Sequence, residues 1–350
     1  MTDLDEALER FQMGALEYGS GFSNHGPMAA EALVELGHSS LLTGLVDLYA
    51  PRLPPFEAGE AIVPEARTAA RGDFSRVSDW VATYEADLAG ADWRERLGCA
   101  LGELAKGGFA AAAHGLLRAA HAARALEREV TPVRLRELAF GLGYWAGRYQ
   151  ELPGEPGIGG TGDAIEILRN LEPVPVAQRK PGLFTESVKL LDGYAPYVDA
   201  VETADLSDAS SSEFIRALCE EGARLYLCNP QSRIAYVHVV TAPSALRLLL
   251  PYADEATRDA LARVAFQTSL ALHAVSSSSS SEEPQIDDEV LRISQDPQEL
   301  RYRAACSLRE HAIKLTECCL REQAIASSET LALAAGDAAV YLENSGGSWG

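Results

Sequence analysis

Apolar residues recur with the period of an α-helix along most of this chain, and this restricts it to folds built from packed helices. One face of the expected N-terminal helix carries four apolar side chains, Leu4, Ala7, Leu8 and Phe11. Similar patterns predict helices at 74–89, 92–105, 108–127, 209–225, 242–250, 254–276 and 298–341, with the last range broken into two. Aromatic residues make up only 7% of the chain, while Ala, Leu, Glu and Arg are abundant, which favours helices over sheets. We therefore predict an all-α fold.

Clusters of proline and glycine separate these helices and make the middle of the chain its least regular part. They lie at 51–60, 151–162 and 172–182. The serine-rich segment 276–284 has the composition of a flexible surface loop. No regular internal repeat is present, which argues against a helical solenoid. Since candidate ligands come from both halves, we expect residues 1–350 to form a single large multi-helix domain with irregular Pro/Gly-rich middle loops.

The acidic composition argues against several classes of partner. Asp and Glu number 51 against 30 Lys and Arg, so the formal net charge is −21 and the surface repels nucleic acid and anionic membranes. The N-terminus lacks the features of a secretory signal, and no stretch reaches the roughly 18 uninterrupted apolar residues of a membrane-spanning helix. The six cysteines show no CxxC spacing and are interpreted as reduced thiols. We expect a cytoplasmic protein that binds neither nucleic acid nor membranes.

Residues 157–162, GIGGTG, match the dinucleotide-binding pattern GxGxxG, but their context differs from that of a cofactor loop. They follow ELPGEP instead of a β-branched strand, and no acidic residue ends a second strand about 20 residues later. A flexible loop before a helix that starts near Asp163 is the simpler interpretation. Walker, HExxH and GxSxG motifs are absent as well, so an NADPH or flavin requirement has no motif behind it.

The seven histidines are the main candidates for chemistry, because a buried imidazole needs a partner. His25 stands just before Pro27, which suits the first turn of a helix, and Ser23 or Asn24 can cap that helix. The His25 ring would therefore lie at a helix entrance. It would either point into a site or make a local loop hydrogen bond.

His114 and His121 lie on one face of a predicted helix, but about 10 Å apart along its axis. That separation is too large for both to bind one metal ion comfortably. We favour His114 as the ligand, because Gly115 beside it permits close approach of another helix or a ligand. His121 is then expected to line the pocket or to support a ligand. The alternative for either residue is a core histidine bonded to a backbone carbonyl.

The second half of the chain contributes His238, His311 and Lys314. His238 lies in IAYVHVV, the most strand-like stretch of the chain, after which Pro243 is expected to open a helix. Lys314 is three residues after His311 and so shares its helix face. Either the lysine points outward and pairs with a nearby glutamate, or it reacts with carbon dioxide to give a carbamate, an anionic ligand for an otherwise all-imidazole site. His38 and His273 are interpreted as surface or capping residues.

Five segments of this chain, in order, resemble the questin oxidase-like family. They are SNHGPMAAEALVELG, HGLLRAAHAARAL, the helix with Tyr144 and Trp145, HVVTAPSALRLL and EHAIKLTE. The resemblance spans nearly the whole chain and implies an oxygenase of secondary metabolism that oxidises or cleaves a ring of an aromatic polyketide such as an anthraquinone. It also implies that His25, His114, His238, His311 and Lys314 bind one metal ion, with Fe(II) the expected metal.

This hypothesis leads to further expectations about partners and pocket. The partners would be dioxygen and a small aromatic substrate, and the chain could form a homodimer. Tyr144 and Trp145 could stack a flat substrate and Arg118 could hold its phenolate, with core packing and an ordinary salt bridge as the alternatives. Two other functions stay open: an NADPH- or flavin-assisted monooxygenase of the same substrates, and a non-catalytic helical protein that binds an aromatic ligand.

Overall fold

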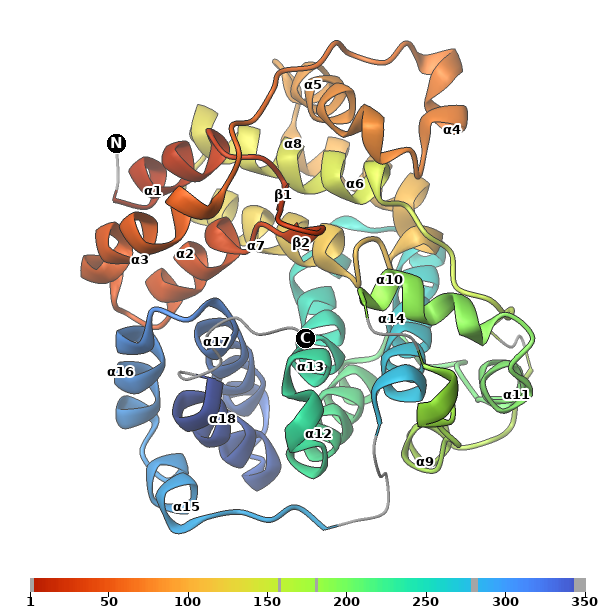
Figure 1. Ribbon diagram of the computed structural model, residues 1–350. Helices are drawn as coiled ribbons and strands as arrows, with labels where there is room; N and C mark the ends of the chain where they lie inside the picture. The colour runs from red at the N-terminus through yellow and green to blue at the C-terminus, as the bar shows by residue number, and fades with distance from the viewer. Residues whose placement is uncertain (1–2, 157–158, 180–181, 278–282, 343–350) are drawn as a thin grey trace. The chain divides into compact units, whose positions relative to one another are not determined.

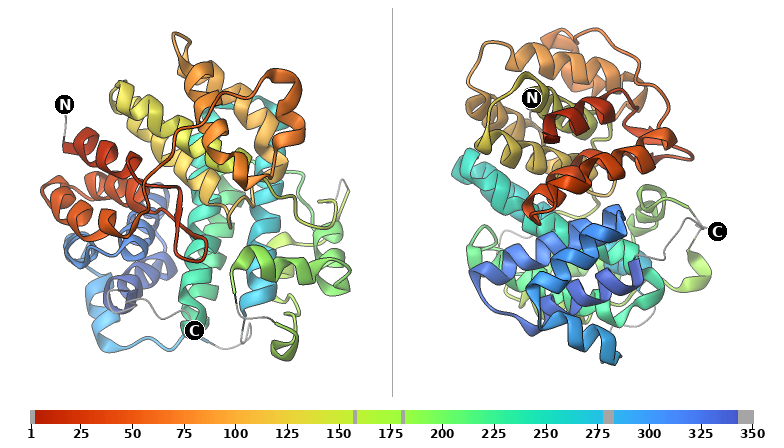
Figure 2. Two further views of the ribbon diagram at one scale, coloured as in Figure 1. Left: turned by 45° about the horizontal axis from the view of Figure 1, so that its top comes forward. Right: turned by 90° about the vertical axis from the view of Figure 1, so that its left-hand side faces the viewer.

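The computed structural model describes residues 3–156, 159–179, 182–277 and 283–342. Within them the chain forms two compact units, of which unit 1 comprises Met1–Glu151 and Ala245–Leu261, and unit 2 comprises Leu152–Ser244 and Ala262–Gly350. Nearly all regular structure is helical (Figure 1), and the further views in Figure 2 show the extended connections between the helices. The predicted all-α fold is confirmed.

Unit 1 begins with a helix, a short hairpin and a second helix, and its later helices pack around α8. The elements are α1 (Asp3–Gln12), β1 (Glu17–Tyr18), β2 (Phe22–Ser23), α2 (Gly26–Glu35), α3 (Leu42–Tyr49), α4 (Arg67–Ala70), α5 (Val77–Leu88), α6 (Trp93–Leu104), α7 (His114–Arg128) and α8 (Pro132–Gly147). Short 3-10 helices occur at Ser39–Leu41, Ala50–Arg52, Pro64–Ala66, Phe74–Arg76, Ala105–Gly107 and Leu250–Tyr252. The hairpin pairs Glu17 with Ser23 and Tyr18 with Phe22.

Two glycines let neighbouring helices approach α8 closely. A Cβ atom on Gly115 of α7 would lie 2.5 Å from the Cα of Trp145, and one on Gly143 would lie 2.8 Å from the backbone nitrogen of Val81 on α5. Neither distance can accommodate a methyl group, because backbone atoms cannot swing aside as a side chain can. The close approach predicted at Gly115 is confirmed. At the start of α8, Thr131 accepts a hydrogen bond from the Arg134 nitrogen and Pro132 occupies the first turn, a strong helix-start signal.

Unit 2 contains the irregular middle of the chain and a set of longer helices. Its elements are α9 (Ala164–Arg169), α10 (Phe184–Ser187), α11 (Ala195–Thr203), α12 (Ser212–Cys228), α13 (Arg233–Leu249), α14 (Glu255–Ser276), α15 (Asp288–Ser294), α16 (Pro297–Ser307), α17 (Glu310–Ile325) and α18 (Glu329–Tyr341), with 3-10 helices at Val176–Gln178, Val188–Leu191 and Pro230–Ser232. The last residues of α13 and the first of α14 belong to unit 1. Asp163 caps α9 by accepting from the nitrogens of Ile165 and Glu166, as expected for a loop that precedes a helix. Residues 157–158 of the GIGGTG stretch and 278–282 of the serine-rich segment lie outside the described residues.

Three helix predictions are wrong in their bounds. The range 108–127 starts as a helix only at His114, and 298–341 holds three helices instead of two. The strand-like stretch around His238 is part of α13, which runs through Pro243. β-Branched residues disfavour helix only slightly, so burial can override them. The thiols of Cys219 and Cys318 donate to the Val240 carbonyl oxygen, at 3.7 and 3.8 Å, in the turn that precedes the proline. These contacts add partners where a proline weakens the helical hydrogen bonding.

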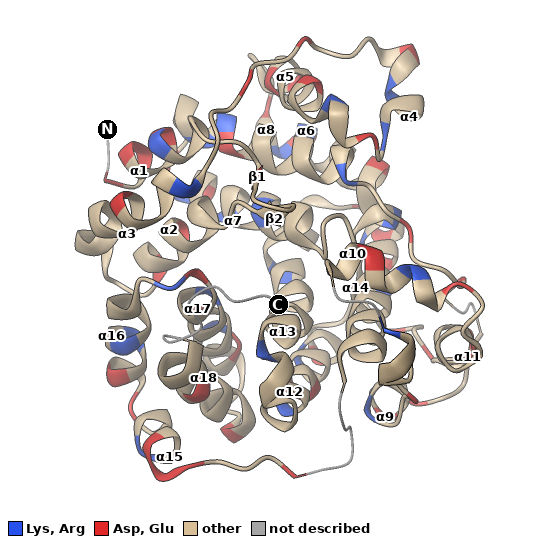
Figure 3. Ribbon diagram, viewed as in Figure 1, with Lys and Arg blue, Asp and Glu red and all other residues tan. Residues whose placement is uncertain are grey.

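The described residues include one long apolar helix, and their charged side chains of both signs are mixed along the chain (Figure 3). One helix, Pro230–Tyr252, is long and apolar enough to cross a membrane by length and composition, but 72% of its most apolar window is buried, as in the core helix of a soluble protein. Figure 3 shows basic residues interspersed among acidic ones along the helices. The cytoplasmic location stays a prediction.

Candidate functional site

His25 lies at the N-terminal end of α2, where its backbone holds the ring in a fixed orientation. Its Nδ1 atom is 2.6 Å from the carbonyl oxygen of Ser23, and its backbone nitrogen donates to the hydroxyl of Tyr49 at 2.9 Å. Asn24 accepts from the Gly26 nitrogen at 3.1 Å. His25 thus has the local loop hydrogen bond considered from the sequence, but its ring also faces a second histidine.

That second histidine, His114, is the first residue of α7 and follows three consecutive alanines in the left-handed region. Ala111, Ala112 and Ala113 have φ values of 51°, 56° and 68°. A left-handed turn of non-glycine residues is costly and rare outside functional sites. This turn presents the Ala111 carbonyl oxygen to the Nδ1 atom of His114 at 2.5 Å.

The two imidazoles meet through their other nitrogens. The Nε2 atoms of His25 and His114 are 2.8 Å apart, and the ring planes are nearly perpendicular, at 86°. Because each Nδ1 faces a carbonyl oxygen, each Nδ1 carries a proton, so in the neutral rings both Nε2 atoms present lone pairs to each other. This arrangement needs either an extra proton or a shared cation. Two imidazoles bound to one ion at about 2.05 Å and at a right angle have nitrogens about 2.9 Å apart.

In unit 2, His238 of α13 and His311 of α17 form a second pair. Their ring centroids are 5.7 Å apart with planes at 74°. The Nδ1 atom of His238 donates to the Ile234 carbonyl oxygen at 2.7 Å, which again directs Nε2 outward from its own helix. Burial, and then the positive charge of Lys314, lowers the pKa of His238 to about 3, so the ring is neutral at physiological pH.

Lys314 lies in the same region of unit 2 and is almost completely buried, with 2% of its surface exposed. Among the described residues its Nζ atom has no hydrogen-bond partner. Burial lowers its pKa to about 7, although the charge of Glu310 acts in the opposite direction. The interpretation of Lys314 as an outward-pointing surface lysine is therefore wrong. An amine that is partly neutral at pH 7 is the form that reacts with carbon dioxide.

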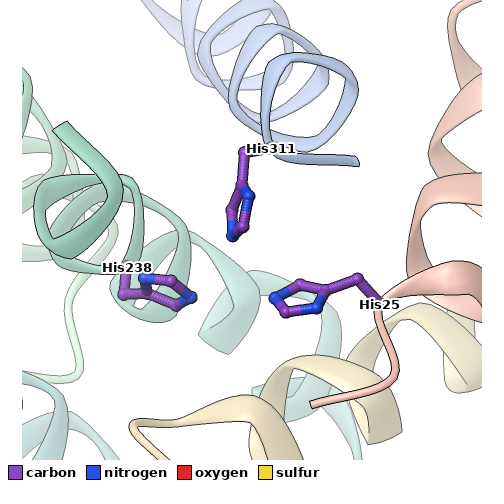
Figure 4. A group of neighbouring side chains, drawn as sticks. All are labelled: His25, His238 and His311. Carbon is purple, nitrogen blue, oxygen red and sulfur yellow. The ribbon is translucent and has the colours of Figure 1, made fainter. Parts of the chain in front are cut away.

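Figure 4 draws three of these histidines, His25 of unit 1 and His238 and His311 of unit 2, each with ring nitrogens that are metal donors. Imidazole nitrogen suits Fe(II), Zn(II), Cu(II) and Ni(II), and backbone carbonyls at Nδ1 are the usual partners of ligating histidines. The residues present therefore fit a first-row transition metal.

Arg118 and His121 lie in unit 1 with partners of their own. Arg118 is 1% exposed and forms an ion pair with Glu137 at 2.6 Å, and the Nδ1 atom of His121 is 2.7 Å from a carboxylate oxygen of Glu31. Arg118, His121 and their partners Glu137 and Glu31 line a cavity of about 10 Å³. That volume suits a single water molecule and not an aromatic ring. Their predicted contact with substrate stays a prediction.

Tyr144 and Trp145 on α8 are both buried. The Trp145 indole nitrogen donates to the Gly107 carbonyl oxygen at 3.0 Å. The Tyr144 hydroxyl is 2.6 Å from the Ser23 hydroxyl. This Tyr144–Ser23 contact had no sequence signal, since 121 residues separate the partners. The stacking of substrate by Tyr144 and Trp145 stays a prediction.

The two histidines interpreted as surface or capping residues differ. His38 is half-buried at the start of a 3-10 helix, as expected. His273 is fully buried, and its Nδ1 is 2.7 Å from the Tyr236 hydroxyl, so its surface assignment is wrong. The serine run beside it suggested exposure, but α14 continues through His273 to Ser276.

Comparisons with known proteins add no family assignment. No family model matches the chain, and no curated protein matches it.

Proposed function

We propose that His25, His114, His238 and His311 bind one transition-metal ion and that the chain is an oxygenase of electron-rich aromatic compounds. The observation that carries the metal site is the His25–His114 pair, whose Nε2 atoms are 2.8 Å apart while both Nδ1 atoms face carbonyl oxygens. A shared cation removes the repulsion between the two lone pairs. The His238–His311 pair supplies the remaining imidazoles, and three of the four ligands are drawn in Figure 4.

Lys314 completes the proposed site as a carbamate. Four neutral imidazoles leave the charge of a divalent ion uncompensated, and a carbamate on Lys314 would supply one negative charge and oxygen donors. Its burial favours the neutral amine that forms the carbamate. Growth or incubation with ¹³C-bicarbonate should give a carbamate ¹³C resonance in the metal-loaded protein. The same sample of the Lys314→Met variant should lack it, and its presence there would contradict the assignment.

The reaction class comes from the resemblance to questin oxidase-like proteins, and the donor set is compatible with it. Fe(II) bound by imidazole and oxygen donors supplies one-electron chemistry that lets dioxygen react with an aromatic ring. The chain's own residues would hold three of the four rings, those of His25, His114 and His238, in fixed tautomers through backbone carbonyls. Arg118, which the sequence predicts to hold a substrate phenolate, forms a buried ion pair with Glu137.

Metal analysis tests the site directly. Protein purified without chelator should contain about one transition-metal ion per chain, and His25→Ala, His114→Ala, His238→Ala and His311→Ala should each lose it while staying helical by circular dichroism. His273→Ala is the matched control, since it also removes a buried imidazole but should retain the metal. Wild-type protein without metal after Fe(II), Co(II) and Zn(II) loading would refute the proposal.

Oxygen consumption separates the three functions. The Fe(II)-loaded protein should consume dioxygen with an anthraquinone-derived hydroquinone in the absence of NADPH and flavin. A strict requirement for an added reductant and flavin would favour the assisted monooxygenase. Tight binding of the aromatic compound without oxygen uptake would favour the non-catalytic binding protein.

A further inference from the structure

A chain of hydrogen bonds in unit 1 connects the protein surface with the loop that holds His25. Arg148 donates from Nε to Glu17 at 2.8 Å, the Tyr144 hydroxyl is 2.8 Å from the same carboxylate, and the Ser23 hydroxyl is 2.6 Å from the Tyr144 hydroxyl. Ser23 is also the residue whose carbonyl oxygen accepts from Nδ1 of His25 at 2.6 Å. Tyr144 thus fixes the side chain of the residue that orients the His25 ring.

The direction of these hydrogen bonds follows from their chemistry. The Glu17 carboxylate is paired with the Arg148 guanidinium and only accepts, so the Tyr144 hydroxyl must donate to it. The Ser23 hydroxyl must then donate to the Tyr144 oxygen. Both hydroxyl protons are used, and Tyr144 is 1% exposed, so no water competes for these contacts.

The same tyrosine packs in the cluster that contains the carbonyl partner of His114. Tyr144 belongs to a buried apolar cluster with Ala111, Leu16, Val81 and Phe140. Ala111 is the left-handed residue whose carbonyl oxygen accepts from Nδ1 of His114. Tyr144 therefore shares a buried cluster with Ala111, whose carbonyl group faces His114. Its hydroxyl binds the side chain of Ser23, whose carbonyl group faces His25.

We propose that Tyr144 is a positioning residue that sets the geometry of both His25 and His114 through Ser23 and Ala111. This role is distinct from the substrate stacking expected from the sequence, which stays a prediction. Only the Co(II) measurement rests on the proposed function, because the orientation of the two rings can be measured in metal-free protein.

The test uses the full-length protein, Co(II) alone as probe, and three variants. Tyr144→Phe removes both hydroxyl contacts and keeps the ring, while Ser23→Ala removes the same contact from the other side and keeps the carbonyl group. Tyr252→Phe is the matched control, since its hydroxyl also donates to a carboxylate, that of Glu127 at 2.7 Å. Glu127 is 13 residues after His114 on α7, about 20 Å along the axis.

The expected result is a roughly 10- to 100-fold weaker Co(II) affinity for Tyr144→Phe and Ser23→Ala, with Tyr252→Phe within about twofold of wild type. The double variant should lose no more Co(II) affinity than the stronger single variant, because both single changes already remove the same Ser23–Tyr144 hydrogen bond. In metal-free protein, ¹⁵N signals of the His25 and His114 rings, assigned with His25→Gln and His114→Gln, should shift in Tyr144→Phe and not in Tyr252→Phe.

The outcomes separate this inference from the proposed function. A wild-type protein that binds no Co(II) refutes the metal site, and the imidazole signals then decide the role of Tyr144. Unchanged His25 and His114 signals in both Tyr144→Phe and Ser23→Ala overturn the inference. Equal losses of Co(II) affinity in Tyr144→Phe and Tyr252→Phe overturn it too, because they would reflect general loosening.

Discussion

Replacement of Ala112 by glycine tests whether the left-handed turn before His114 is strained. Ala112 has a φ of 56° and is 4% exposed. An L-residue in this conformation costs roughly 1–2 kcal/mol, which glycine avoids. Loss of the buried methyl group costs about 0.8 kcal/mol. The two effects nearly cancel, so Ala112→Gly should change the free energy of unfolding by less than about 1 kcal/mol.

The matched control is Ala123→Gly in the interior of α7. Ala123 is fully buried and helical, so its replacement loses a methyl group of similar burial without any relief of strain. Glycine in a helix costs about 1 kcal/mol more than alanine, so the total loss should be about 2 kcal/mol. The two Ala→Gly variants should therefore differ by about 2–3 kcal/mol although the same methyl group is removed in both.

Urea unfolding followed by circular dichroism measures this difference, and thermal unfolding at one scan rate gives a second comparison. The reasoning fails if Ala112→Gly is destabilised as much as Ala123→Gly, since the turn would then store no strain that glycine can release. A stabilised Ala112→Gly with weakened Co(II) affinity would show that the strain holds the Ala111 carbonyl group against His114.

Three other perturbations have expected results. Burial lowers the pKa of His273 to about 4, so as the pH falls this side chain is protonated in the unfolded protein before it is protonated in the folded protein. His273 should therefore lower the free energy of unfolding by about 2 kcal/mol between about pH 7 and about pH 5. Urea titrations at both pH values should show a loss that is smaller in His273→Gln than in wild type by this amount, because His238, with a pKa of about 3, contributes a similar loss in both proteins. Arg118→Leu should lower the free energy of unfolding by about 3–5 kcal/mol, because it leaves the Glu137 carboxylate buried without its cation, unless Glu137→Leu is added. Gly115→Ala should lose about 1–3 kcal/mol through a backbone clash, whereas Gly102→Ala, whose new methyl group would meet only the Thr257 hydroxyl at 3.5 Å, should be neutral or stabilising in the same assay.

The sequence was sufficient for the fold class, because helical periodicity depends on local patterns. Asp163 also marked a helix start correctly. The bounds of α13 were missed because the β-branched residues around His238 resemble a strand. Local propensity of this kind is weak, and packing within unit 2 outweighs it.

The candidate site was only partly accessible to sequence reasoning. Helix rise separated His114 from His121, and the structure gives each a different partner, His25 and Glu31. The burial of Lys314 could not be predicted, because a lysine three residues after a histidine occurs on exposed helices as well. The left-handed turn at 111–113 was also hidden, since alanine rarely adopts that conformation and is the residue most associated with helix.

The partner of Nδ1 distinguishes three of the four proposed ligands from the other buried histidines, whereas Nδ1 of the fourth, His311, lies 3.7 Å from the Glu310 carboxylate. In His25, His114 and His238 this atom faces a backbone carbonyl oxygen two to four residues earlier in the chain. In His121 and His273 it faces a side chain, that of Glu31 or Tyr236. A carbonyl group only accepts, so it forces the proton onto Nδ1 and leaves a lone pair on Nε2, whereas a hydroxyl group permits either tautomer and a carboxylate stabilises the charged ring. No side-chain substitution can remove a backbone acceptor, so these three rings keep a metal-binding tautomer as long as their own segments keep their shape. The orientation of these rings therefore depends on residues that shape those segments, such as Tyr144 and the left-handed alanines.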